Sequence, residues 1–204
     1  MINVIYLEGG GDSKELHARC REGFRKLLEC SNFRGRMPRL VASGGRSEAY
    51  KDFCTQQGQA SQGDYVAMLI DSEGAVEDRE ATWQHLANRD GWSRPAGAHD
   101  DQVLFMTTCM ETWIVADQAA LGARYGSALQ TSALPPLTDL ELRPPAEVVA
   151  DLCHATRDRK HGYTKGKASF ELLATLDPGT LQRYLPSFVR ALYILKEKLG
   201  TPHA

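Results

Sequence analysis

Short apolar runs alternate with longer amphipathic segments along the first half of the chain. The run at 65–70 is apolar throughout, which is typical of a strand buried on both faces of a parallel sheet. Shorter apolar runs predict three further strands at 2–7, 39–42 and 103–106. A helical pattern follows each of the first three strands. The chain is therefore expected to form an α/β fold, a roughly four-stranded parallel sheet with crossover helices on both faces.

The helix expected after the first strand is indicated by an apolar stripe at spacings of three and four. We expect Asp12 to cap this helix, with Glu15 completing a capping box. The stripe is formed by Leu16, Cys20, Phe24, Leu27 and Leu28. The next two helices are expected to pass through Ala49, Phe53 and Gln57 and to span about 76–88.

The second half of the chain has a different pattern. Two proline pairs, Pro135-Pro136 and Pro144-Pro145, bracket a stretch without periodicity that reads as a loop. Helical patterns follow at about 146–156, 168–176 and 187–199, and we expect these helices to pack on the sheet. The organisation predicted is one domain over 1–204, with a sheet core at 1–117 and a loop and helical extension at 118–204.

Composition narrows the class of protein only slightly. The chain has 204 residues, of which 42% are hydrophobic and 25% charged, as is usual for a globular protein. The net charge of −2 does not indicate any particular partner. Charge is unevenly distributed, with an excess of +6 between Lys14 and Lys51 and of −7 between Asp71 and Asp117. These regions are either solvated helix faces or an acidic metal pocket beside a surface that holds a polyanion.

The cysteines and the lengths of the apolar stretches indicate where in the cell the protein is expected. Five scattered cysteines, without a Cys-x-x-Cys pair, favour reduced thiols over a disulfide framework or a zinc site. The first residues lack the pattern of a signal peptide, and no window approaches the roughly 20 apolar residues that cross a bilayer. We therefore expect a cytoplasmic protein that does not contact a membrane.

Acidic side chains stand at the ends of two predicted strands. Glu8 ends the first, and Asp71 and Glu73 end the third. Ligands of open parallel sheets bind at the carboxyl ends of the strands, so these three carboxylates would converge if the strands are neighbours. Crowded carboxylates of this kind suit Mg²⁺ or Mn²⁺. The alternative is that each residue only caps the helix that follows.

A triple glycine, 9–11, follows Glu8 and permits close approach of an anion to backbone amides. As a phosphate-binding signal it is weak, because no later glycine completes the dinucleotide-binding spacing. No Gly-x-x-x-x-Gly-Lys-Ser/Thr motif occurs, so the chain is not expected to be a P-loop ATPase.

Three segments, taken in their order and spacing, resemble the Toprim-like family of small bacterial proteins that are often encoded beside an ATPase in anti-phage defence loci. Toprim domains also occur in topoisomerases, bacterial primases and the overcoming-lysogenization-defect (OLD) nucleases. The segments are Leu7-Glu8-Gly9-Gly10-Gly11-Asp12, Leu69-Ile70-Asp71-Ser72-Glu73 and Met110-Glu111-Thr112-Trp113-Ile114-Val115-Ala116-Asp117.

The resemblance implies a four-stranded parallel sheet, with a glutamate after the first strand and an Asp-x-Asp pair after the third, that binds Mg²⁺ for phosphodiester chemistry. By position Glu8 matches the glutamate and Asp71 the first aspartate. Glu73 replaces the second aspartate and is one methylene longer, a departure that bears on metal geometry. Because this chain lacks a Walker motif, the resemblance also implies a separate ATPase subunit of the ABC or AAA type.

Other residues complete the candidate site. Asp12 is either a further metal ligand or a plain helix cap, and Glu111 either supports the ligands or belongs to a core helix. Positive charge for a phosphate is expected from Arg46, which follows Ser43-Gly44-Gly45, and from a basic loop. In this loop Lys165 or Lys167 would neutralise the transition state, while the others, Arg159 and Lys160 among them, would track the backbone of a nucleic acid. The alternative for each is a solvated side chain. The loop contains Arg157, Arg159, Lys160, His161, Lys165 and Lys167.

The leading hypothesis is a Mg²⁺-dependent, Toprim-like nuclease acting on DNA or RNA, as the effector of an ATPase-containing anti-phage system. A second hypothesis is a non-catalytic subunit that binds a partner ATPase or nucleic acid. A third is a phosphohydrolase that uses the same carboxylates on a small substrate. An oligomer is compatible with each of them.

Overall fold

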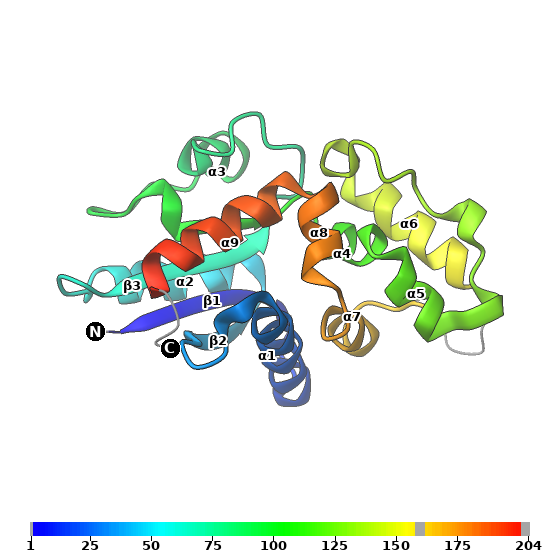
Figure 1. Cartoon of the computed structure of the whole chain (residues 1–204). Helices are drawn as coiled ribbons and strands as arrows, with labels where there is room; N and C mark the ends of the chain where they lie inside the picture. The colour runs from blue at the N-terminus through cyan, green and yellow to red at the C-terminus, as the bar shows by residue number, and fades with distance from the viewer. Residues whose placement is uncertain (1, 158–161, 201–204) are drawn as a thin grey trace.

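The computed structural model describes residues 2–157 and 162–200 (Figure 1). Four parallel strands form one sheet in the order β2-β1-β3-β4, with helices on both faces. The α/β fold class expected from the sequence is therefore confirmed, and each strand lies where an apolar run predicted it. The strands are β1 (Asn3–Gly10), β2 (Arg39–Gly44), β3 (Tyr65–Asp71) and β4 (Val103–Met106).

Alternate side chains of the central strands supply two cores. Ile5 and Leu7 of β1 face the core beneath helices α1 and α9, whereas Val4 and Tyr6 face the core beneath α2 and α3. Figure 1 shows α1 and α9 on the near side of the sheet and α2 behind it. This burial on both faces explains why the strands are nearly continuous apolar runs. The helices are α1 (Lys14–Leu28), α2 (Arg46–Gln57), α3 (Thr82–Asp90) and α9 (Pro186–Leu199).

Helix α1 buries the predicted stripe but begins one residue later than expected. Its N-cap is Ser13, whose hydroxyl accepts a hydrogen bond from the Leu16 amide at 3.4 Å. Ser13 has the extended backbone that a cap requires, with φ −90° and ψ 123°. The capping box of Asp12 and Glu15 was therefore wrong, since Asp12 lies outside the helix and is exposed.

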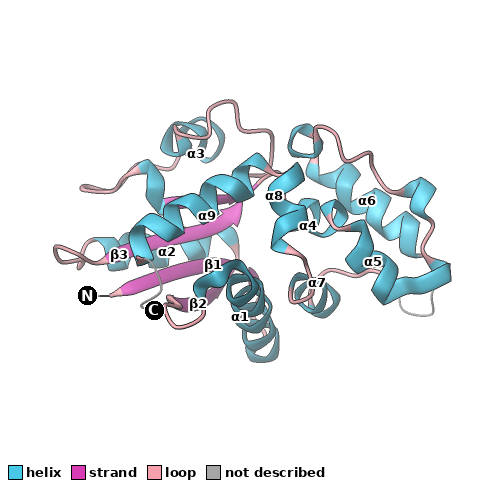
Figure 2. Ribbon diagram, in the orientation of Figure 1, coloured by secondary structure: helices cyan, strands magenta, loops and turns pink. Residues whose placement is uncertain are grey.

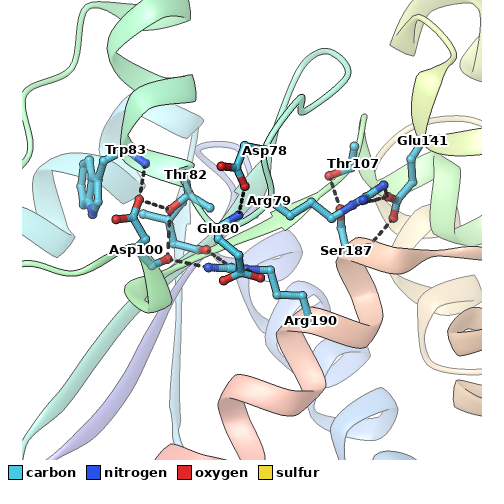
Figure 3. Close-up of polar contacts among 11 residues, drawn as sticks. Asp78, Arg79, Glu80, Thr82, Trp83, Asp100, Thr107, Glu141, Ser187 and Arg190 are labelled. Atoms are coloured by element: carbon cyan, nitrogen blue, oxygen red, sulfur yellow. Dashed lines mark hydrogen bonds and ion pairs between the residues drawn. The ribbon is translucent and has the colours of Figure 1, made fainter.

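Helix α3 begins at Thr82, six residues after the expected start, and residues 74–81 form a loop. A distant residue satisfies the first turn of this helix. The Trp83 amide donates to the Asp100 carboxylate at 2.9 Å, and the Thr82 hydroxyl donates to the Asp100 carbonyl at 2.9 Å (Figure 3). This cap comes from a segment beyond the helix, so no local pattern could mark it.

The remaining helices lie beyond the carboxyl ends of the strands (Figure 2). The patterns at 146–156, 168–176 and 187–199 correspond to α6, α7 and α9, while α5 and α8 were not expected. Only part of the predicted packing is correct, because α9 covers the sheet whereas α6 packs on α4 and α7 on α1. These helices are α4 (Met110–Ala116), α5 (Gln118–Tyr125), α6 (Pro145–Thr156), α7 (Lys167–Leu173) and α8 (Pro178–Tyr184).

Short turns of other helix types connect these elements. A π-turn, Glu29–Phe33, continues α1. The 3₁₀ turns are Asp100–Gln102, Gly126–Ala128, Thr131–Ala133 and Leu140–Leu142. Among the described residues, no helix combines the length and the apolar character needed to cross a membrane.

Candidate functional site

The carboxylates at the strand ends meet at the carboxyl edge of the sheet. Strands β1 and β3 are neighbours, with Leu7 opposite Leu69, so the residues that follow lie side by side. The Asp71 amide donates a hydrogen bond to Glu8 Oε2 at 2.9 Å. One carboxylate oxygen from each of Glu8, Asp71 and Glu73 lies within 4.8 Å of the other two. The strand order thus brings Glu8 next to Asp71 and Glu73, although 63 positions separate Glu8 from Asp71.

Glu73 reaches the cluster from a tight turn. Its backbone is left-handed, with φ 60°, which is uncommon for a residue other than glycine and costs about 1 kcal/mol. The Glu73 amide donates to the Thr108 carbonyl at 2.8 Å, and the buried Ser72 hydroxyl donates to the Gly74 carbonyl at 2.6 Å. The Glu73 carboxylate is 3.8 Å from Arg89. The turn is thus held by its own backbone and by the segment after β4.

The electrostatics of the cluster favour a cation. Burial raises the pKa of Glu8 to about 6, although the Asp71 amide and the nearby Arg46 act to lower it. Burial, followed by the charges of Glu8 and Glu111, raises the pKa of Asp71 well above its usual range. Within the described part of the chain, Asp71 Oδ1 is buried without a hydrogen-bond partner. Crowded carboxylate oxygens, two of them on partly buried residues, fit Mg²⁺ or Mn²⁺.

A cavity of about 310 Å³ opens beside Glu8 and Asp71. The triple glycine forms one wall, where Gly10 has φ 97° and a Cβ atom would meet the His17 side chain at 2.5 Å. This glycine is therefore needed for the close approach of α1 to β1. The opposite wall comes from the start of α4 and from the start of α7. The other lining residues are Leu16, Gly44, Met106, Met110, Glu111, Lys165, Gly166, Ser169 and Phe170.

Glu111 is buried at the back of this cavity, with 1% of its surface exposed. The Tyr163 hydroxyl donates to Glu111 Oε1 at 2.5 Å and lies 2.7 Å from the Ser169 hydroxyl. The same helix places Trp113 and Ile114 in the core. The interpretation as part of a core helix is therefore confirmed, and the carboxylate of Glu111 also lines the cavity beside the cluster.

Lys165 supplies positive charge at the mouth of the cavity. Its ammonium is 3.6 Å from Glu111 Oε2, while 63% of the side chain is exposed. Burial acts to lower the pKa of Lys165, but the charges of Glu111 and Asp71 outweigh it and hold the pKa above its usual value. Lys165 is thus a charged group that can reach from the cluster towards solvent.

Arg46 lies close to the cluster, but its guanidinium is enclosed. Its Nε donates to the Asp71 carbonyl at 3.0 Å, and its Nη1 is 2.8 Å from the Asp90 carboxylate. The guanidinium also stacks over Trp92, 4.6 Å from the ring centroid. Only 11% of the Arg46 side chain is exposed. These contacts favour a role in anchoring Asp71 over the predicted contact with a nucleic-acid phosphate.

The structure does not bring every predicted residue into the site. Asp12 is exposed and does not belong to the carboxylate cluster. Lys167 begins α7 with 61% of its side chain exposed and lies 3.9 Å from Glu171. Arg159 and Lys160, with His161, lie outside the described residues.

Two groups beside the site were not anticipated. Tyr163 and Ser169 join Glu111 from 52 and 58 positions further along the chain. Arg46 also has partners that are distant in the sequence, namely Asp90 and Trp92. A lone aromatic residue in an otherwise polar loop is the one local signal that could have indicated Tyr163.

The fold and the site define an α/β protein with an acidic cluster at the carboxyl edge of a parallel sheet. The chain belongs to the family described as Domain of unknown function (DUF4276), whose model matches residues 7–195. This match includes Glu8, Asp71, Glu73, Glu111 and Lys165. Comparisons with curated proteins and with solved structures gave no match.

Proposed function

We propose that this protein is a metal-dependent nuclease that hydrolyses phosphodiester bonds of DNA or RNA. The observation that carries the proposal is the convergence of Glu8, Asp71 and Glu73 within 4.8 Å at the carboxyl edge of the sheet. These three side chains would hold Mg²⁺ or Mn²⁺, and the strongest candidate ligand is the buried Asp71 Oδ1, which has no hydrogen-bond partner among the described residues. A bound divalent ion supplies a water of lowered pKa and stabilises negative charge on a phosphate.

The other residues of the site would orient and support these ligands. Arg46 holds the Asp71 backbone, and the Asp71 amide holds the Glu8 carboxylate. Lys165 would bind a phosphate oxygen at the mouth of the cavity, since its ammonium is charged and largely exposed. Tyr163 keeps Glu111 in place, and Glu111 in turn attracts Lys165 towards the cluster.

The resemblance to Toprim-like proteins supports the same reaction and adds a partner. We propose a separate ATPase subunit, because the chain has no Walker motif with which to bind ATP itself. Nucleic acid and ATP are both cytoplasmic, so the proposed setting is the cytoplasm. An effector role in anti-phage defence rests on the resemblance alone.

The proposal is tested by cleavage of plasmid DNA and of RNA with Mg²⁺, with Mn²⁺ and with a chelator. Asp71→Asn should lower metal-dependent cleavage by about 100-fold or more, since losing a metal ligand costs about 3 kcal/mol of transition-state stabilisation. The matched control is Asp52→Asn, in α2, which lies outside the cluster. Cleavage by Asp71→Asn at the wild-type rate would overturn the assignment.

A second candidate activity is hydrolysis of a small phosphoester. The cavity beside the carboxylates has a volume of about 310 Å³, at the lower end of small-molecule sites. Hydrolysis of free nucleotides without cleavage of any polymer would favour this alternative. Titration calorimetry with Mg²⁺ and Mn²⁺ distinguishes both activities from a non-catalytic interaction subunit, for which neither ion should give heat that depends on Glu8 and Asp71.

A further inference from the structure

A buried carboxylate outside the cluster, Glu141, links three segments of the chain. It lies in the 3₁₀ turn Leu140–Leu142 and is 4% exposed. Its Oε1 accepts a hydrogen bond from the Ser187 amide at 2.8 Å, and its Oε2 accepts from the Ser187 hydroxyl at 3.0 Å and from Arg79 at 3.2 Å. Figure 3 shows Arg79 and Ser187 converging on this carboxylate. The start of α9 and the loop 74–81 are thus both tied to the turn Leu140–Leu142.

The same network reaches the segment that follows β4. The Thr107 hydroxyl donates to the Ser187 hydroxyl at 2.9 Å (Figure 3), and the Thr108 hydroxyl donates to the Arg143 carbonyl at 2.8 Å. The Thr108 carbonyl in turn accepts a hydrogen bond from the Glu73 amide at 2.8 Å. Glu73 is therefore held to residues 107–108, which are themselves held to the turn that carries Glu141.

The loop that follows Glu73 is also fixed from this side. Arg79 reaches Glu141 from the loop, and the neighbouring Glu80 pairs with Arg190 of α9 at 3.1 Å. Arg190 is itself anchored, since it donates to the Val103 and Asp100 carbonyls at 3.2 and 3.1 Å. The loop after Glu73 is thus bound to the Glu141 carboxylate directly through Arg79, whereas the segment 107–108 is connected to it through Ser187.

We propose that Glu141 is a positioning residue, which fixes the backbone at Glu73 so that its carboxylate faces Glu8 and Asp71. The consequence for metal binding rests on the proposed function, whereas the consequence for the backbone does not. Glu73 is the exposed member of the cluster and has a left-handed backbone, so it depends most on support from its neighbours. Glu141 itself touches neither the cluster nor the cavity beside it.

Amide hydrogen exchange tests the backbone role directly. Glu141→Gln removes the charge and one acceptor, and Arg79→Ala cuts only the link to the loop. Both should speed exchange of the Glu73 amide by about 10-fold, the effect of weakening one buried hydrogen bond. Exchange at Val66, a buried residue of β3, should stay unchanged.

The matched control is Arg124→Ala, which removes an arginine of similar exposure from an ion pair with Glu171 at 2.8 Å. It should leave exchange of the Glu73 amide as in the wild type. Unchanged exchange at Glu73 in both test variants would overturn the proposal. Equal acceleration at Glu73 and Val66 would overturn it too, because it would indicate general destabilisation.

Metal affinity gives a second and more specific readout. Glu141→Gln should weaken Mn²⁺ binding by about 10-fold, as is usual for groups that orient metal ligands. In a Glu73→Gln background the same substitution should have no further effect, because Glu141 acts through Glu73. An equal loss in both backgrounds would contradict this route. If the wild type binds no Mn²⁺, the proposed function fails and the exchange measurement alone decides the role of Glu141.

Discussion

The guanidinium of Arg46 shows how a charged side chain can organise the site without reaching solvent. It is enclosed by the Asp71 carbonyl, the Asp90 carboxylate and the Trp92 ring, and that ring stacks on Tyr50 at 4.3 Å between centroids. Asp90 is equally buried, with 11% of its side chain exposed. Removing Arg46 would take from Asp90 one of its two arginine partners, since Arg89 also pairs with it, and removing Asp90 would leave the Arg46 guanidinium without its carboxylate in a poorly hydrated environment.

We predict that Arg46→Ala lowers the free energy of unfolding by about 3 kcal/mol, the cost of breaking a buried ion pair from one side. Arg21→Ala, at an exposed position of α1, should change it by less than about 0.5 kcal/mol. Urea unfolding of the purified variants measures both values. If Arg46→Ala were as stable as the wild type but bound nucleic acid less tightly, the side chain would instead be a phosphate contact.

At this scale the sequence identifies residue types better than it identifies their partners. Glu8, Asp71 and Glu73 could be found because each stands at the end of a predicted strand. The carboxyl ends of neighbouring parallel strands lie at the same edge of the sheet, which brings the three side chains together. Arg46 follows a strand in the same way, yet its environment depends on Asp90 and Trp92, more than 40 positions away. Local pattern cannot show which distant groups will enclose a side chain.

Among the elements, the spacing between α1 and α7 sets one wall of the cavity. Gly23, in the middle of α1, faces α7 so closely that a Cβ atom would lie 2.8 Å from the Phe170 carbonyl oxygen. Phe170 lines the cavity together with Gly166 and Ser169. A glycine that weakens the helix by its own propensity is therefore explained by the contact between the two helices.

We predict opposite effects for alanine at two helical glycines. Alanine favours a helix by about 1 kcal/mol over glycine, so Gly122→Ala in α5, with open space at its Cβ position, should stabilise the protein. Gly23→Ala should instead destabilise it by about 1–3 kcal/mol, because overpacking against α7 outweighs propensity. Chemical denaturation distinguishes the two. A gain in stability for both variants would show that α7 can move away without cost.

The strands could be predicted more fully than the helices, for physical reasons. A strand buried on both faces leaves an apolar run that stands out in the sequence, as at 65–70. Helix α3 starts late because Asp100, far along the chain, satisfies its first turn. Helices α5 and α8, of 8 and 7 residues, are too short to establish a period.

In the whole molecule, one continuous core joins the sheet to the helical extension. Leu7 and Leu69 of the sheet, Trp113 of α4 and Phe170 of α7 all belong to the same buried cluster. Glu8 and Asp71 on one side, and Glu111 and Lys165 on the other, are therefore carried by elements that share one core. The cavity is lined by residues from both parts.

The basic region, between Lys14 and Lys51, and the acidic region, between Asp71 and Asp117, have different structural roles. Much of the basic excess of α1 is engaged in pairs along its own surface, such as Arg19 with Glu15 at 2.8 Å and Lys26 with Glu22 at 3.5 Å. For this helix the solvated face is the better interpretation, since such pairs are typical of exposed helices. The acidic region, by contrast, contributes Asp71 and Glu73 to the cluster.

The acidic cluster makes the stability of the whole molecule depend on pH and on divalent cations. The pKa of Glu8 rises from 4.5 to about 6 on folding, so between these values the native state binds more protons than the unfolded chain. Without metal, stability should therefore fall as pH rises through this window. The loss from Glu8 is about 2 kcal/mol, absent below pH 4.5 and complete above pH 6.

We predict that Glu8→Gln makes the free energy of unfolding depend less on pH. The glutamine side chain can still accept the hydrogen bond from the Asp71 amide, but it carries no charge. With a chelator present, Glu8→Gln should be more stable than the wild type at pH 7.5 and nearly equal to it at pH 4. Mn²⁺ should reverse the order at pH 7.5, since a cation stabilises only a site whose carboxylates are ionised and intact. Denaturant unfolding at the two pH values, with chelator and with Mn²⁺, measures all of these differences. Identical pH profiles for the two proteins without metal would mean that Glu8 does not carry the penalty, and the case for a cation at this edge of the sheet would lose its electrostatic basis.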